Sequence, residues 1–219
     1  MKPLKPKTVD FRQAQEDLRS TLRQGMLDAA TQLLTDEGPS ALTVRRVAEA
    51  VNCSTTLLYS LFGGKDGLAN ELYLEGFARL KAEFAAATAT TRSDQAHGLD
   101  SILTHARIYH DYAKFNPSYY MVMFGDAIAG FVPPVESRKQ AWESLAVLIE
   151  TFEECMQSGA LPRSNPVAAA RLLWAAMHGA TSLELKGYYL KTERADELFN
   201  AAVHAVLRSL QVDPDQRPL

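Results

Sequence analysis

The chain has 219 residues, and its 47% hydrophobic content is enough to bury one or two sizeable cores. No apolar run approaches the ~20 residues that a membrane span needs, and the N-terminus lacks a signal-peptide core, so we expect a cytoplasmic protein with no membrane partner. A net charge of −3 argues by itself against a nucleic-acid binder, and the distribution changes this only slightly, because residues 1–68 carry a net +1 and the remainder a net −4.

Local patterns predict an all-α protein, because alanine is abundant and two-residue hairpin signals are missing. Residues 1–15 begin with three lysines and two prolines and are expected to form a flexible basic arm, either a solvated tail or a contact to DNA. A helix is predicted from Glu16 to Glu37, before Gly38-Pro39. Its inward-facing residues should be Leu18, Leu22, Met26, Ala29, Ala30, Leu33 and Leu34.

The stretch from Thr43 to Leu68 predicts two short helices joined by a tight turn, then the start of a third helix. The first carries an apolar stripe that ends at Asn52-Cys53, where asparagine tolerates a left-handed backbone. Ser54 offers a cap for the second helix, which carries Leu58, Leu61 and Phe62. This helix–turn–helix spacing is the one that presents a second helix to the DNA major groove.

The same stretch resembles the DNA-binding domain of the tetracycline-repressor (TetR/AcrR) family of bacterial transcriptional regulators. The matching positions are Thr43, Val47, Ala48, Cys53, Ser54, Leu58, Tyr59, Phe62, Lys65 and Leu68. Two positions depart from the family pattern: Asn52 replaces a turn glycine, and Leu61 replaces a common histidine. The resemblance implies a three-helix DNA-binding head over residues 16–68, on a larger helical ligand-binding and dimerisation domain over residues 69–212.

The candidate DNA contacts come from the motif and from the position of each residue on the second helix. Thr55 and Thr56 occupy its first turn, where hydroxyl and methyl groups approach base edges. Thr43 is either a helix cap or a phosphate contact, and Leu57 either meets a thymine methyl group or packs on the preceding helix. The resemblance implies that Tyr59 and Lys65 contact phosphates. The full candidate set is Thr43, Ser54, Thr55, Thr56, Leu57, Tyr59, Ser60 and Lys65.

The larger domain is predicted as a series of helices with polar or proline-containing breaks. We expect helices at 66–87, 95–115, 119–124, 135–157, 166–186 and 195–210, a polar linker at 88–94, a loop at 125–134 and a frayed tail at 212–219. The two cysteines, Cys53 and Cys155, are expected to be free thiols.

Aromatic and methionine residues are densest between Tyr109 and Phe124, at the family's ligand-pocket position. Such side chains suit an adaptable apolar cavity, although ordinary core packing explains each of them singly. The candidate ligand-binding residues are Tyr109, Tyr112, Tyr119, Tyr120, Met123, Phe124, Trp142 and His178. For His178 a satisfied core or interface position is the alternative.

A resemblance in the C-terminal third also points to a partner. Trp174, His178 and Gly179 resemble the Trp-His-Gly signature of one TetR C-terminal subtype. In the family the last two long helices of each subunit form a four-helix dimer interface. We expect no metal site, because no histidine pair has helical metal-ligand spacing, and we expect no cofactor.

The sequence therefore predicts a homodimeric repressor that a small, largely apolar effector releases from a pseudo-palindromic double-stranded operator. An activator or a ligand-independent regulator of the same fold is the alternative. A more distant alternative is an all-α small-molecule-binding protein or an enzyme, but no catalytic triad, phosphate loop or acidic metal cluster supports an enzyme.

Overall fold

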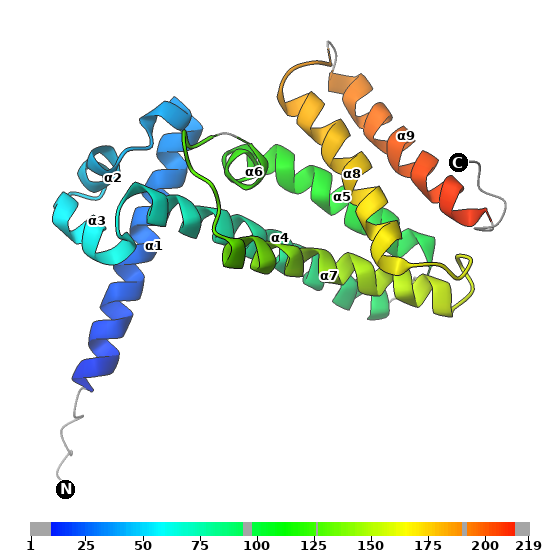
Figure 1. The fold of residues 1–219 in the computed structure, drawn as a ribbon, viewed down its shortest axis with the longest axis horizontal. Helices are drawn as coiled ribbons and strands as arrows, with labels where there is room; N and C mark the ends of the chain where they lie inside the picture. Colours follow the sequence, from blue (N-terminus) through cyan, green and yellow to red (C-terminus); the bar gives the residue numbers. More distant parts are fainter. Residues whose placement is uncertain (1–9, 94–97, 126, 190–191, 213–219) are drawn as a thin grey trace, which may run out of the picture. The chain divides into compact units, whose positions relative to one another are not determined.

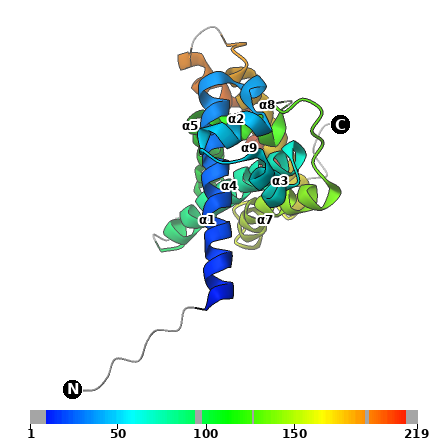
Figure 2. The ribbon, with the colours of Figure 1, turned by 90° about the vertical axis from the view of Figure 1, so that its left-hand side faces the viewer.

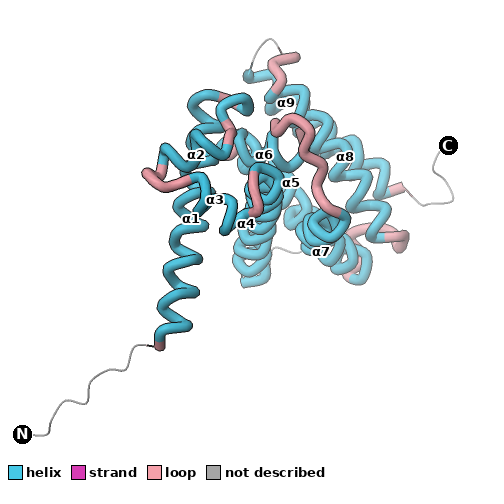
Figure 3. The backbone as a smooth tube through the Cα atoms, turned by 60° about the vertical axis from the view of Figure 1, so that its left-hand side comes forward, coloured by secondary structure: helices cyan, strands magenta, loops and turns pink. Residues whose placement is uncertain are grey.

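The structure is a computed structural model that describes residues 10–93, 98–125, 127–189 and 192–212. Within these residues the secondary structure is helical, with turns and loops between the helices (Figure 3). The chain divides into two compact units, of which the N-terminal unit extends to Leu72 and includes residues 126–132. The C-terminal unit consists of residues 73–125 and 133–219. The fold is therefore all-α, with a smaller N-terminal and a larger C-terminal helical unit.

The N-terminal unit contains the three helices that the sequence predicts, joined by short turns (Figures 1 and 2). Its elements are α1 (Phe11–Glu37), a 3₁₀ turn η1 (Pro39–Ala41), α2 (Val44–Ala50), α3 (Thr55–Phe62) and the beginning of α4 (Lys65–Ser93). Its core consists of apolar residues that are almost fully buried, among them Met26, Ala30, Leu34, Leu42, Val47, Ala48, Leu58 and Leu68.

Helix α1 begins five residues before the predicted start. The Asp10 carboxylate accepts hydrogen bonds from the Arg12 and Gln13 amides at 3.0 and 3.4 Å, which is the N-cap arrangement. Residues 11–15, predicted as part of the arm, are therefore helical, and residues 1–9 lie outside the described residues. Leu18, which was expected to face inward, is 60% exposed, because the first turns of α1 extend beyond the core of the unit.

The C-terminal unit contains the rest of α4 and five further helices. These are α5 (Leu99–Phe115), α6 (Pro117–Phe124), α7 (Val135–Gln157), α8 (Pro166–Leu185) and α9 (Thr192–Gln211), with α8 and α9 side by side (Figure 1). Its most buried side chains include Ile102, Tyr109, Tyr112, Leu148, Phe152, Leu173 and Met177.

Of three further predictions for this unit, one is wrong and two fall partly outside the described residues. The polar run 88–93 is the last part of α4 and not a linker, and at its start the Thr88 hydroxyl donates to the Phe84 carbonyl at 3.0 Å within the helix. Helix α5 begins at Leu99 after Gly98, whereas residues 94–97, which include its predicted start, lie outside the described residues. Of the predicted tail, residues 213–219 lie outside them as well.

Candidate functional site

The turn between α2 and α3 has the geometry that the sequence predicts. Asn52 adopts a left-handed backbone with φ of 52°, and the Cys53 amide donates to the Ala48 carbonyl at 2.9 Å. The Ser54 hydroxyl then accepts from the Leu57 amide at 3.3 Å and caps α3. A short turn and two capped helix ends therefore place the first turn of α3 at the surface of the N-terminal unit.

The exposed residues of α3 form one surface, which we call the α3 surface: Thr55, Thr56, Tyr59 and Ser60. The Tyr59 side chain is 56% exposed. Its ring lies against Gly64, where an added Cβ atom would stand 3.1 Å from the Tyr59 Cε1 atom. Gly64 has φ of 123°, a conformation that favours glycine, so this residue allows the chain to turn into α4 beside the tyrosine ring.

Of the other predicted DNA contacts, Thr43 and Ser54 are exposed, while Leu57 and Lys65 are partly buried. Thr43 caps α2 by accepting from the Arg46 amide at 3.2 Å, which leaves its hydroxyl hydrogen available to donate. Its two predicted roles are therefore compatible. The Ser60 hydroxyl already donates to the Leu57 carbonyl at 2.8 Å, so it offers mainly an acceptor.

Two arginines of α1, which sequence reasoning missed, hold the C-terminal end of α3. Arg23 donates to the Leu61 carbonyl at 2.5 Å, pairs with Glu71 at 2.5 Å and lies 4.8 Å from the centroid of the Phe62 ring. Arg19 donates to the Ser60 carbonyl at 3.2 Å. The last carbonyls of a helix lack partners within the helix, and they attract cations. The signal available in the sequence was the i, i+4 spacing of Arg19 and Arg23, which places both side chains on one face of α1.

The C-terminal unit contains a partly open cavity of about 190 Å³ whose lining is mainly aromatic and aliphatic. Four helices contribute: α4, α6, α7 and α8, with one residue from α5. The lining residues are Tyr73, Phe77, Leu80, Phe84, Tyr109, Met123, Phe124, Arg138, Ala141, Trp142, Ser144, Leu145, Leu148, Trp174 and Met177. Such a lining suits an apolar ligand with few polar contacts.

The cavity includes four of the eight residues predicted to bind a ligand: Tyr109, Met123, Phe124 and Trp142. Tyr112 and Tyr119 lie outside its lining, because they face other directions from their helices. The Tyr112 hydroxyl donates to the Gly76 carbonyl at 2.8 Å, and Arg79 lies 4.7 Å from the centroid of the Tyr119 ring. The last two, Tyr120 and His178, also lie outside the lining, and they contact Tyr109.

Tyr109, Tyr120 and His178 form a buried polar cluster next to the cavity. The His178 Nδ1 atom lies 2.7 Å from the Tyr120 hydroxyl and 3.2 Å from the Tyr109 hydroxyl, and the two hydroxyls are 3.2 Å apart. Burial lowers the pKa of His178 and raises the pKa of Tyr120 to about 12. Both tyrosines are therefore protonated near pH 7, and their hydroxyls share hydrogen bonds with each other and with Nδ1 of the imidazole, whose tautomer sets which atom donates.

A second buried histidine, His105, lies between α4 and α7. Its Nε2 atom is 3.0 Å from the Thr88 hydroxyl and its Nδ1 atom is 3.5 Å from the Thr151 hydroxyl. The ring is 1% exposed and meets Phe84 edge-on at 5.3 Å between centroids. Burial lowers the pKa of His105, so the neutral ring is the stable form in this core.

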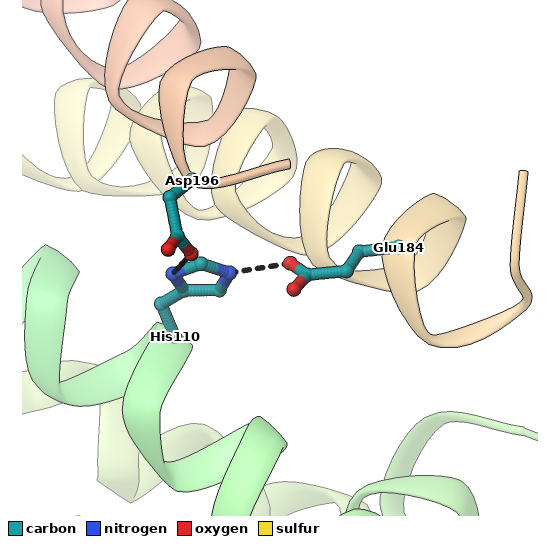
Figure 4. Close-up of side chains that lie close together, drawn as sticks. All are labelled: His110, Glu184 and Asp196. Carbon is teal, nitrogen blue, oxygen red and sulfur yellow. Dashed lines mark hydrogen bonds and ion pairs between the residues drawn. The ribbon is translucent and has the colours of Figure 1, made fainter. Parts of the chain in front are cut away.

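A third histidine, His110, joins α5 to α8 and α9 (Figure 4). Its Nε2 atom is 2.5 Å from a Glu184 oxygen and its Nδ1 atom is 3.8 Å from an Asp196 oxygen, while its ring stacks on Phe199 at 4.1 Å. The three side chains are close enough to hold a metal ion. Lys114, however, lies 2.9 Å from Asp196 and 4.0 Å from Glu184, so an ammonium group already pairs with both carboxylates. We interpret the cluster as an ion-pair network.

Cys53 and Cys155 are free thiols, as the sequence predicted, and burial raises the pKa of Cys155 to about 11. No helix among the described residues combines the length and the apolar character needed to cross a membrane.

Comparison with known families places both units. Residues 26–72 match the family described as "Bacterial regulatory proteins, tetR family", and residues 102–206 match the family described as "Tetracyclin repressor-like, C-terminal domain". Together the two matches cover well over half of the chain.

Individual proteins show the same similarity. An HTH-type transcriptional regulator of Mycobacterium tuberculosis (strain H37Rv) is 23% identical over 199 residues, which cover 79% of this chain and 84% of that protein. A protein of unknown function from Rhodococcus sp. RHA1 has a TM-score of 0.73 at 21% identity, covering 87% of this chain and 96% of that one. The TetR family transcriptional regulator PfmR from Thermus thermophilus has a TM-score of 0.62 at 19% identity, covering 85% and 99% of the two chains. The solved structures share the fold.

Proposed function

The chain belongs to the tetR family of bacterial transcriptional regulators, and from this premise we propose that it is a homodimeric repressor released from its operator by a small, largely apolar effector. Proteins of this family are regulators and not enzymes. The observation that carries the proposal is the exposed first half of α3, which follows α2 after a four-residue turn. Operator DNA lies in the bacterial cytoplasm, and there we place the protein.

The α3 surface supplies chemistry suited to both base edges and phosphates. In the proposed complex Thr55 and Thr56 enter the major groove, where their hydroxyls hydrogen-bond to bases and their methyls meet thymine methyl groups. Tyr59 and Lys65 contact phosphates, which position the helix without reading sequence. Arg19 and Arg23 keep the far end of α3 attached to α1, so that the groove-facing turn is held rigidly.

The exposed apolar stripes of α8 and α9 support dimerisation. Leu172 and Leu183 of α8 are 48% and 43% exposed, and Leu198 of α9 is 45% exposed. On α8, Ala176 and Gly179 lie between the two leucines at helical spacing, and such small residues allow two helices to approach closely. In a two-fold dimer these stripes form a four-helix interface, and the two α3 helices then reach half-sites about 34–36 Å apart.

Helix α4 provides the proposed coupling between effector and DNA. It runs without a break from Lys65, in the N-terminal unit, to Ser93, in the C-terminal unit. Four of its residues line the cavity: Tyr73, Phe77, Leu80 and Phe84. An effector that displaces this helix changes the separation of the two α3 helices in the dimer. Couplings of this kind typically amount to ~1–3 kcal/mol, or roughly a 5–150-fold change in DNA affinity.

The DNA-binding proposal is tested by a gel shift with the region upstream of the protein's own gene. We expect salt-dependent binding that Tyr59→Phe combined with Lys65→Ala weakens, because two phosphate contacts are lost. Lys139→Ala, which changes an exposed lysine of the C-terminal unit, is the matched control. Undiminished binding by the double variant would contradict the contact assignment. Raised transcription of the target gene on binding would identify an activator instead.

The dimer is tested by analytical ultracentrifugation. Leu172→Glu places a charge in the proposed interface and is expected to produce monomers that bind the operator weakly. Phe115→Glu changes an 82% exposed apolar residue of α5, outside the stripes, and should leave the dimer intact. A dimer that survives Leu172→Glu combined with Leu183→Glu would rule out this interface.

A further inference from the structure

The lining of the cavity in the C-terminal unit carries positive charge and no negative charge. Among its lining residues Arg138 is the one charged side chain, and no aspartate or glutamate lines it. The other polar groups of the lining are hydroxyls and indole nitrogens, and two of the hydroxyls already have partners: Ser144 donates to the Ala141 carbonyl at 2.8 Å, and Tyr109 belongs to the cluster with Tyr120 and His178. A cavity whose lining has one cation and no carboxylate favours a ligand that carries negative charge, and it offers no counter-charge to a ligand that is positive.

Arg138 lies at the open side of this cavity. Both Arg138 and Trp142, one turn apart on α7, are exposed, whereas Tyr109 and Met177 on the far side are 2% and 1% exposed. The positive charge of Arg138 lowers the pKa of Tyr73 against the larger, opposite effect of burial, which places the guanidinium near that phenol. Arg138 is therefore situated where the cavity meets solvent, with the Trp142 indole one turn away on the same helix.

The Arg138 guanidinium is also available to a ligand. No carboxylate among the described residues forms an ion pair with it, whereas the neighbouring Lys139 pairs with Glu136 at 3.1 Å. Arg171, on α8, stacks on the Trp142 ring, with its Cζ atom 5.0 Å from the ring centroid. The first turn of α7 adds its own positive end to the same region. The mouth thus combines one cation that has no carboxylate partner among the described residues with a second, Arg171, that stacks on the Trp142 ring.

The size of the cavity bounds the apolar part of the ligand. A dry apolar cavity of about 150 Å³ holds benzene, so the 190 Å³ here accommodates a body of roughly six to eight carbon atoms. We propose that the effector is a small anionic amphiphile: a carboxylate held by Arg138 at the mouth, with a short alkyl or single-ring body against the aromatic lining. This inference rests on the proposed effector role of the cavity and adds the charge and size of its ligand.

The chain provides its own probe for this proposal. Trp142 and Trp174 are its two tryptophans, and both line the cavity, so occupancy changes the intrinsic fluorescence without any need for DNA. Octanoate, 1-octanol and octylamine each have eight carbon atoms and carry an anionic, a neutral and a cationic head group near pH 7.5, where they are titrated into the full-length protein. We expect octanoate to bind at least about threefold more tightly than octanol, and octylamine more weakly than octanol.

Variants locate the charge effect. Arg138→Gln should weaken octanoate binding by about three- to tenfold and leave octanol binding unchanged, because only the anion loses a partner. Lys139→Gln, one residue away and outside the lining, should change neither titration. Thermal unfolding followed by the same fluorescence shows whether Arg138→Gln remains folded, and the unchanged octanol titration is a second measure of an intact cavity.

Four results would overturn the inference: equal binding of the three probes, no binding of any of them, octanoate binding that Arg138→Gln leaves intact, or equal weakening by Lys139→Gln. Operator binding is measured separately by the gel shift, so the proposed DNA-binding function can stand when any of these results overturns the inference. If octanol were the one probe that bound, and if it released the protein from the operator in a gel shift, the proposal of a repressor with an apolar effector would be supported and the proposal of an anionic ligand would be refuted.

Discussion

Replacing Arg23 with alanine should loosen α3 without disturbing the C-terminal unit. The Arg23 side chain makes three interactions within the N-terminal unit: a hydrogen bond to the Leu61 carbonyl at 2.5 Å, an ion pair with Glu71 at 2.5 Å and a cation–π contact with Phe62. Its side chain is 28% exposed, so solvent screens these interactions only in part. Without them, the last carbonyls of α3 lose their tether to α1.

The three interactions differ in size. A hydrogen bond from a charged donor contributes ~1.5–3 kcal/mol, a partly exposed ion pair ~0–1 kcal/mol, and a cation–π contact ~0.5–1 kcal/mol. They share one side chain and are not additive, so we expect Arg23→Ala to lower the free energy of local opening of α3 by about 2–3 kcal/mol. Arg19→Ala, which removes one exposed hydrogen bond of 3.2 Å, should lower it by less than about 0.5 kcal/mol.

Amide hydrogen exchange measures this opening directly. At ~1.4 kcal/mol per tenfold change, the α3 amides of Arg23→Ala should exchange roughly 30–150 times faster, and those of Arg19→Ala at most about threefold faster. Amides of α8 should keep their rates in both variants. Equal acceleration by the two substitutions, or acceleration confined to α1, would refute the conclusion that Arg23 anchors α3.

Three further predictions concern backbone strain, pH and the ion-pair network. Gly64→Ala should destabilise the protein by at least ~1 kcal/mol in urea unfolding, because Gly64 has φ of 123° and the new methyl group would meet the Tyr59 ring. Gly25→Ala, at an open helical position, is the control and should stabilise the protein by up to ~1 kcal/mol. Burial lowers the folded-state pKa of His105, so the unfolded chain binds the proton more readily than the folded chain. The contribution of His105 to stability should therefore be complete above the unfolded pKa of ~6.5 and be lost as the pH falls below it. His105→Gln should flatten this pH dependence, and an unchanged pH profile of the variant would contradict the assignment. Glu184→Ala should cost ~1–3 kcal/mol of unfolding free energy, because it leaves the buried Nε2 atom of His110 without its partner; a melting temperature equal to that of the native chain would show that the network contributes nothing.

Helix ends and turns were predictable because their causes are local. Ser54 caps α3, Asn52 takes the left-handed position, and Asn165 precedes the proline that opens α8, all within a few residues of the helix end concerned. The errors of prediction were local as well: the capping Asp10 went unrecognised, and the polar run 88–93 was interpreted as a linker although α4 continues through it.

The cavity shows where local reasoning stops. The aromatic density from Tyr109 to Phe124 located its region, yet Tyr112 and Tyr119 face away from it, while Arg138 and Trp174 line it from helices distant in sequence. Adjacent residues on a helix point about 100° apart, so composition alone does not tell which of them face a cavity. The sequence also did not indicate why position 76 is glycine, whereas the structure shows that a side chain there would collide with Met123.

The sequence by itself determined the helical class, the turn that exposes α3 and the family, because these depend on residue types at short, ordered spacings. Only the tertiary structure decided that Arg23 secures α3, that His110 meets carboxylates from two other helices and that Arg138 is the charged residue of the cavity. Arg23 and Leu61 are 38 positions apart in the chain, and His110 and Glu184 are 74 apart. At such separations the pairing depends on how whole helices pack, which no local pattern records.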